Sequence, residues 1–117
     1  MASKSLRVNL RQIGSARIID LPADLLAEIE EALLAAAEVV FASDAQLLVL
    51  DFSKVAYANS AGIGVLVILL QRAKSRGMPV VVTQVSGQPR IILERVGIPR
   101  YARVCESLDE ALQGDVP

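Results

Sequence analysis

The sequence predicts an α/β domain in which helices pack on a partly parallel β-sheet. Short aliphatic runs, typical of buried strands, alternate along the chain with amphipathic segments of helical period. Helix follows strand three times in this pattern, which favours right-handed crossovers between parallel strands. With 117 residues, 53% of them hydrophobic, the chain can fill one core without disulfides or structural metals. We therefore expect a single domain over residues 1–117.

The first half of the chain predicts a hairpin, a long helix and a buried strand. Residues 6–21 alternate loosely in hydrophobicity around a Gly14-Ser15 turn, which indicates two antiparallel strands. Apolar side chains then recur at steps of three or four, so residues 23–42 are expected to be helical, with Pro22 suited to the first turn. Residues 46–50 form an aliphatic run ending at Asp51-Phe52, which predicts a strand covered on both faces. Residues 53–59 are expected to form a loop.

The second half predicts further alternation of helix and strand. Residues 60–76 are expected to form a helix that stops at Gly77, followed by a buried strand over 79–85. A short helix over 88–96 ends at Gly97, and an edge strand covers 102–104. Ser107-Leu108-Asp109-Glu110 has the form of a capping box, which predicts the start of a last helix.

The composition excludes most catalytic and metal chemistry. The chain has no histidine and one cysteine, so zinc sites, histidine acid–base catalysis and an internal disulfide are excluded or nearly so. Cys105 follows a short strand without a second thiol nearby, and we expect a buried structural thiol. We expect no catalytic residues, no metal site and no cofactor, and an enzyme is the least favoured class.

Charge and hydropathy argue against nucleic-acid and membrane partners. A net charge of -1 and 3% aromatic residues are atypical of a nucleic-acid binder. The longest apolar stretch, residues 61–70, is about half the roughly 20 residues that a membrane-spanning helix needs, and the N-terminus does not resemble a secretory signal. We expect a cytoplasmic protein. The second half of the chain is locally basic and the first half is locally acidic. Charged helix faces exposed to solvent are the favoured explanation, and electrostatic attraction of a partner is the alternative.

The sharpest local feature precedes and opens the helix over residues 60–76. It reads Tyr57-Ala58-Asn59-Ser60-Ala61-Gly62-Ile63-Gly64-Val65 and resembles the D-S-S/T/A-G-L/I-G-V motif of STAS domains, the sulfate-transporter and anti-sigma-factor-antagonist family. The order of hairpin, first helix, buried strand and later β-α pattern extends the resemblance over nearly the whole chain. The resemblance implies an α/β fold with a mixed sheet of about four to five strands and helices packed mainly on one face.

The same resemblance implies a site. It makes Ser60 the residue that a partner kinase phosphorylates, and it implies a partner surface made of Asn59, Ser60, Ala61, Gly62, Ile63 and Asp24. A helix N-terminus carries unpaired N–H groups and about half a unit of positive charge, which suits a phosphate. Gly62 and Gly64 are expected to leave the backbone open to a kinase or phosphatase. The alternative is that Ser60 is a plain helix cap, and the resemblance favours the switch.

Two segments depart from the family pattern. Asn59 stands where most phosphorylated antagonists carry aspartate, and an amide keeps the shape but cannot act as a base. Asp20-Leu21-Pro22-Ala23-Asp24 replaces the usual glycine-containing lead into the first helix. Asp20 or Asp24 could contribute to a partner surface, with capping of the first helix as the favoured role.

Three functions remain open. The preferred one is an antagonist that binds an anti-sigma factor with serine kinase activity, is released when Ser60 is phosphorylated, and is reset by a serine phosphatase. The second is a scaffold subunit of a signalling assembly, with a homo-oligomer as its expected form. The third is a small-molecule or lipid sensor with a pocket between sheet and helices. The apolar residues around much of the helix over 60–76 either meet a partner or are covered by neighbouring helices, and both remain open.

Overall fold

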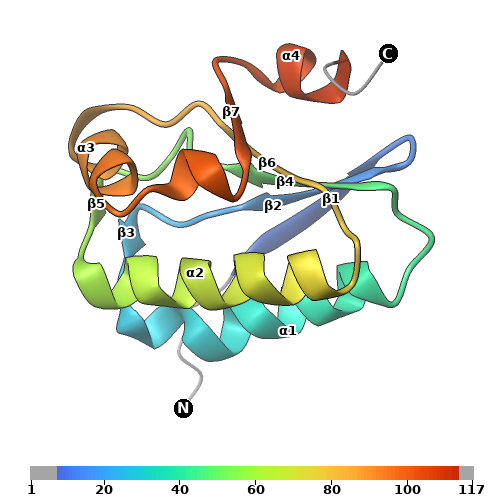
Figure 1. Cartoon of the computed structure of the whole chain (residues 1–117), viewed down its shortest axis with the longest axis horizontal. Helices are drawn as coiled ribbons and strands as arrows, with labels where there is room; N and C mark the ends of the chain where they lie inside the picture. Colours follow the sequence, from blue (N-terminus) through green and yellow to red (C-terminus); the bar gives the residue numbers. More distant parts are fainter. Residues whose placement is uncertain (1–7, 114–117) are drawn as a thin grey trace.

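A computed structural model of the chain describes residues 8–113 and contains a five-stranded mixed sheet (Figure 1). The strand order is β1 (Asn9–Ile13), β2 (Ala16–Asp20), β4 (Leu47–Asp51), β6 (Val80–Thr83) and β7 (Arg103–Cys105). β1 runs antiparallel to β2, and every other neighbouring pair in this sheet is parallel. The predicted α/β fold class is confirmed.

The N-terminal hairpin forms as predicted, around Gly14, which has a φ of 58°. β1 is one of the two edge strands, and its apolar residues Leu10 and Ile13 are 39% and 40% exposed because no helix among residues 8–113 covers this edge of the sheet. The expected strand start at residues 6 and 7 lies outside the described residues. The core therefore begins at β2, where Ile18 and Ile19 are fully buried on opposite faces of the sheet.

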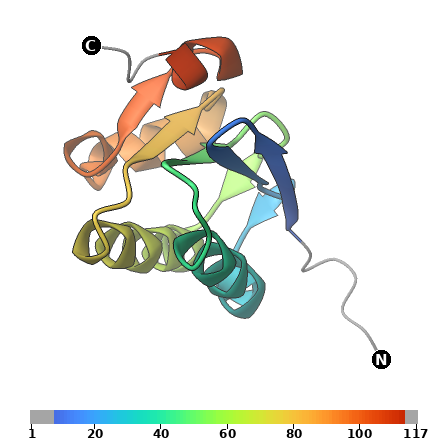
Figure 2. The ribbon, with the colours of Figure 1, turned by 90° about the vertical axis from the view of Figure 1, so that its right-hand side faces the viewer.

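The two long helices cover one face of the sheet. α1 (Glu30–Phe41) and α2 (Ser60–Ser75) lie side by side beneath it, as Figure 2 shows, and bury Leu33 and Leu66 in the same core cluster as Leu50 of β4. α4 (Leu108–Gln113) packs Ala111 on the opposite face, where it joins a smaller cluster that includes Ile18. Helices thus lie mainly on one face, because the parallel crossovers through α1 and α2 return on that side.

The prediction for residues 23–42 is wrong at its start. Asp24 and Leu25 form a two-residue strand, β3 (Asp24–Leu25), parallel to β5 (Tyr57–Ala58) in a second small sheet, so β5 also interrupts the predicted loop. A short 3-10 helix, η2 (Ala27–Ile29), follows, and α1 begins only at Glu30. Leu25 and Ile29 are both buried and lie four residues apart, which is the spacing expected on an α-helix. The same spacing occurs here in a strand followed by a 3-10 helix, so the sequence pattern placed the start of α1 too early.

The expected caps of the first helix are also wrong. α1 has Ile29 at its N-cap with no side-chain hydrogen bond, so neither Asp20 nor Asp24 caps it. Asp20 ends β2 and instead accepts hydrogen bonds from Asn9 and Arg11, each 2.8 Å long. Because the chain enters α1 through β3 and η2, the acidic residues upstream lie too early to reach the free amides of that helix.

The second half follows the predictions closely. α2 stops before Gly77, which has a φ of 71°, while α3 (Gly87–Arg95) and the 3-10 helix η3 (Ile98–Arg100) flank Gly97. The strand expected over 79–85 is shortened to β6, and the edge strand shifts by one residue to β7.

The predicted capping box starts α4. The Ser107 hydroxyl accepts from the Glu110 amide at 3.1 Å, and the Glu110 carboxylate accepts from the Glu106 amide at 2.9 Å. Cys105 is buried as predicted, and this burial raises the pKa of its thiol.

Candidate functional site

The site predicted from the sequence lies where β5 passes into α2, and Asn59 forms the turn between them. Asn59 has an extended backbone (φ -105°, ψ 173°), and its side-chain oxygen accepts a hydrogen bond from the Gly62 amide at 2.8 Å. Its carbonyl accepts from the Ile63 amide at 3.0 Å. Asn59 is therefore the helix cap, and the alternative that made Ser60 a plain cap is wrong.

Ser60 is the first residue of α2 and is exposed to solvent. Within the described part of the chain, its hydroxyl makes no hydrogen bond, because the capping position is already taken by Asn59. The amides of Ser60 and Ala61 belong to the first turn, where N–H groups have no partner within the helix. The hydroxyl is therefore free to react, beside backbone groups that would stabilise an anion.

Gly62 has a structural role different from the one predicted. A Cβ atom added there would collide with the Leu25 carbonyl and lie 2.8 Å from the Leu26 amide nitrogen. Gly62 is buried at this crossing of α2 over β3, so it does not open the backbone to a kinase. Gly64 is exposed, with nothing within 4 Å of an added Cβ, and matches the prediction of open space.

The remaining predicted site residues divide between surface and interior. Ala61 is exposed and Asn59 is half-buried, whereas Ile63 lies in the core with 2% of its surface exposed. Asp24 is exposed on β3, paired in register with Tyr57. The structure thus groups Asp24, Asn59, Ser60 and Ala61 at one end of the molecule, and places Gly62 and Ile63 beneath that surface.

Gln88, on α3, is a site residue that the sequence analysis missed. Its side-chain oxygen accepts from the Ala58 amide at 2.9 Å, and its side-chain nitrogen donates to the Ala58 carbonyl at 2.7 Å. On the side of β5 that faces away from β3, these two bonds pair the backbone amide and carbonyl of Ala58 in place of a neighbouring strand. They thereby hold the residue directly before Asn59. A glutamine near a helix start carries no pattern that identifies such a partner 30 residues away.

The arrangement of sheet, helices and serine-bearing turn agrees with comparisons to known proteins. The family model for the STAS domain matches residues 7–111. The chain belongs to the STAS domain family.

Solved structures show the same fold at low sequence identity. An anti-sigma factor antagonist from Mycobacterium paratuberculosis is 21% identical, with a TM-score of 0.75 over 92% of this chain and 91% of that one. A sulfate transporter family protein from Wolinella succinogenes is 18% identical, with a TM-score of 0.77 over 87% of this chain and 85% of that one. The Bacillus cell fate determinant SpoIIAA in its phosphorylated form is 14% identical, with a TM-score of 0.71 over 92% and 97% of the two chains. These similarities establish the fold of this STAS domain.

An exposed stripe on α2 of this STAS domain extends from Ser60. Ser60, Gly64 and Ile68 are spaced by four residues and all exposed, so they follow one side of the helix. Ile68 is 36% exposed, and Tyr57 of β5 is 48% exposed. The other apolar residues of α2 are mostly buried, so neighbouring elements of the chain cover most of the apolar surface of this helix and Ile68 is its exposed large apolar side chain.

The first turn of α2 in the STAS site contains no acidic residue, so no carboxylate within that turn would repel a phosphate on Ser60. A separate charged cluster joins Arg11 to Asp20 at 2.8 Å and to Asp51 at 3.3 Å, and these bonds occupy the carboxylates that end β2 and β4. Among residues 8–113, no group of three or more acidic or thiol side chains could hold a metal ion, and no helix is long and apolar enough to cross a bilayer.

Proposed function

We propose that this STAS domain is a cytoplasmic anti-sigma-factor antagonist, which binds an anti-sigma factor with serine kinase activity and is released when that kinase phosphorylates Ser60. A serine phosphatase would then restore the binding form. The observation that carries the proposal is the position of Ser60, exposed at the first turn of α2 with its hydroxyl unused by the capping bond that Asn59 makes.

The geometry supports phosphorylation without unfolding of the helix. A phosphoserine at this position would lie at the positive end of the α2 dipole, where an anion stabilises a helix. Because the Gly62 amide is bonded to the Asn59 side chain, the phosphate would not displace the existing cap. Modification would therefore change the surface charge and leave the fold in place.

The exposed stripe on α2 explains how one phosphate could control binding. Partner contacts over Gly64 and Ile68 would be largely apolar, with Ser60 at their edge. A phosphate adds roughly -1.5 to -2 charges, which must lose water or meet a like charge when the partner docks. A penalty of about 3 kcal/mol would lower affinity about a hundredfold, and one buried unfavourable charge is enough to cause it.

Asn59 is compatible with this proposal. It supplies the capping oxygen without placing a second negative charge beside the phosphate. The solved phosphorylated form of SpoIIAA shows that a member with this fold accepts the modification. An asparagine cannot serve as a base, so we expect the partner kinase to supply the base that deprotonates the Ser60 hydroxyl.

The test is phosphorylation by the kinase activity of the native host. The protein is incubated with ATP and a soluble extract, and phosphorylated residues are located by mass spectrometry. We expect phosphate on Ser60, none on Ser60→Ala, and wild-type behaviour from Ser53→Ala, which removes an exposed serine of the preceding loop. If the extract phosphorylates a related antagonist carrying aspartate before its serine but leaves this protein unmodified, the proposal is wrong.

A further inference from the structure

Tyr101 projects from a basic surface at the end of α2 opposite to Ser60. Two grooves of about 380 Å³ and 550 Å³ meet there, and both are lined by Pro79, Val80, Arg100 and Tyr101. The Tyr101 side chain is 55% exposed between them. Lys74 lines the first groove and Arg103 the second, so three cations surround one exposed aromatic ring.

These cations lack carboxylate partners within residues 8–113. The described ion pairs use the arginines at 11, 17, 72, 76 and 90, and none involves Lys74, Arg100 or Arg103. Five of the eight arginines among residues 8–113 form ion pairs, whereas the three cations around Tyr101 form none. Tyrosine and arginine, together with tryptophan, are enriched among the residues that contribute most to binding at protein interfaces. The composition of this surface therefore suits an acidic protein partner.

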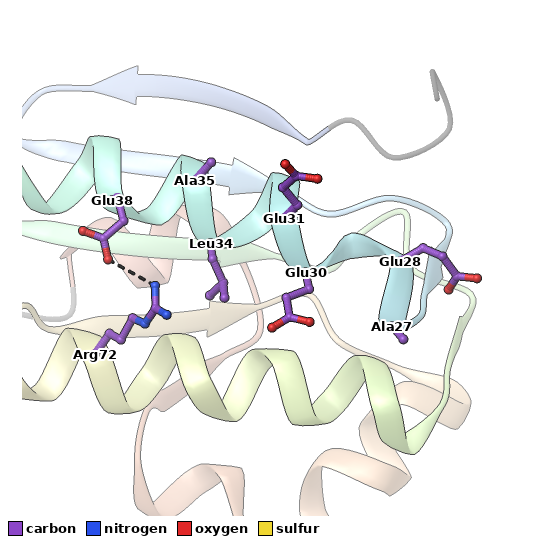
Figure 3. Close-up of a pocket in the computed structure, with 8 residues that line it drawn as sticks. All are labelled: Ala27, Glu28, Glu30, Glu31, Leu34, Ala35, Glu38 and Arg72. Atoms are coloured by element: carbon purple, nitrogen blue, oxygen red, sulfur yellow. Dashed lines mark hydrogen bonds and ion pairs between the residues drawn. The ribbon is translucent and has the colours of Figure 1, made fainter. Parts of the chain in front are cut away.

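A complementary surface lies elsewhere on the same chain. A groove of about 580 Å³ between α1 and α2 is lined by Leu34, Ala27 and Ala35 and by the carboxylates Glu28, Glu30, Glu31 and Glu38. In Figure 3, Glu30 and Leu34 extend from α1 toward α2, while Glu38 is bonded across the groove to Arg72 at 3.4 Å. Across residues 8–113, Glu28, Glu30 and Glu31 form no ion pair. The groove thus combines an apolar floor with three free negative charges.

We propose that these two surfaces bind each other between copies of this chain. Tyr101 of one copy would enter the groove between α1 and α2 of the next, and Lys74, Arg100 and Arg103 would face Glu28, Glu30 and Glu31. The surface around Tyr101, here called the knob, and the groove carry opposite charges, equal numbers of unpaired charged groups, and apolar groups at their centres. Because the two surfaces differ, the contact is heterologous, so association continues into chains or closes into a ring.

The contact is tested by complementation between two variants that each lose one surface. Glu30→Lys/Glu31→Lys removes the acidic groove and keeps the knob, whereas Tyr101→Ala removes the knob and keeps the groove. Sedimentation at low salt is expected to show assemblies larger than dimers for the wild type and monomers for each variant alone. An equimolar mixture of the two variants can form only one contact, so it is expected to stop at a dimer.

Controls separate this contact from general charge effects. Arg95→Glu changes an exposed cation outside the three grooves and is expected to associate as the wild type does. Raising salt from about 20 mM to about 0.5 M should weaken association at least about tenfold, because the facing charges are exposed. Arg100→Glu/Arg103→Glu replaces Tyr101→Ala if circular dichroism shows that the latter is unfolded.

Three results would overturn the proposal. The wild type could remain monomeric with a Kd weaker than about 1 mM, the mixture of variants could remain monomeric, or a dimer could persist in both single variants. The first two results would show that the basic surface does not bind the acidic groove of a second copy. Each leaves the phosphorylation test at Ser60 unaffected, since that test is read on single chains.

Discussion

The crossing of α2 over β3 permits a sharp test with two glycines of the same helix. Gly62→Ala places a methyl group against the backbone of Leu25 and Leu26, neither of which can move as the end of a side chain could. Overpacking of this kind costs about 1–3 kcal/mol. Gly64→Ala makes the same chemical change two residues later, where nothing lies within 4 Å, and it should gain about 0.5–1 kcal/mol from helix propensity.

Urea unfolding followed by circular dichroism measures both effects. We expect the free energies of unfolding of the two variants to differ by about 1–3 kcal/mol, because the gain in helix propensity is common to both and only Gly62→Ala overpacks. Gly62→Ala should be the less stable of the two, and Gly64→Ala should lie at or above the wild type. The urea dependence should stay the same in all three proteins, because neither change alters the surface exposed on unfolding. Equal free energies for the two variants would refute the close crossing of α2 over β3, and with it the role assigned to Gly62.

Three further predictions concern the cap, the β5 contact and acid stability. Asn59→Ala should lower the free energy of unfolding by about 0.5–2 kcal/mol, whereas Asn59→Asp retains the cap and should match or exceed the wild type in thermal melts at pH 7. Gln88→Ala leaves the Ala58 amide and carbonyl without partners and should cost about 1–3 kcal/mol in urea unfolding, while an undiminished free energy would contradict the contact. Burial raises the pKa of Asp20, but hydrogen bonds from Arg11 and Asn9 outweigh it and hold the pKa below the usual 3.8. The stability this carboxylate contributes is therefore complete above pH 3.8 and is lost as the pH falls through the lower folded-state value. Asp20→Asn should then show a shallower loss of stability than the wild type below pH 4, and Asp44→Asn, at an exposed ion pair, should not differ from it.

The fold was predictable because strand and helix signals alternate clearly from β4 onward. The bounds of β4, α2 and α3 were predicted to within a residue or two. The aliphatic run indicated β4, and the glycines that follow α2 and α3 indicated where these helices end. The error came at residues 24–29, where Leu25 and Ile29 are buried at helical spacing although the chain there is strand and 3-10 helix. Only pairing with β5, more than 30 positions away, decides that conformation, and local periodicity carries no information about it.

The site was predictable in position and not in the roles of its residues. The motif identified Ser60, but capping chemistry is shared by serine and asparagine, so the sequence did not show which of the two caps α2. The function of Gly62 depends on Leu25 lying beneath it, which is a tertiary contact. Gln88 was missed for the same reason, because its partner is a backbone group and no residue type at position 58 could reveal it.

The small β3–β5 sheet is expected to make the Ser60 end of the domain locally less stable than its centre. Its ladder spans two residue pairs. Around it, the Ala23 carbonyl accepts from the amides of Ala56 and Tyr57, the Leu25 carbonyl accepts from the Asn59 amide, and Gln88 makes two bonds to Ala58. The central strands β2 and β4 pair over five residues and are buried on both faces. Amide hydrogens of β5 should therefore exchange with solvent through local fluctuations, while those of β4 exchange only on global unfolding. The Ser60 end of the domain is therefore expected to fluctuate locally while the central sheet stays closed.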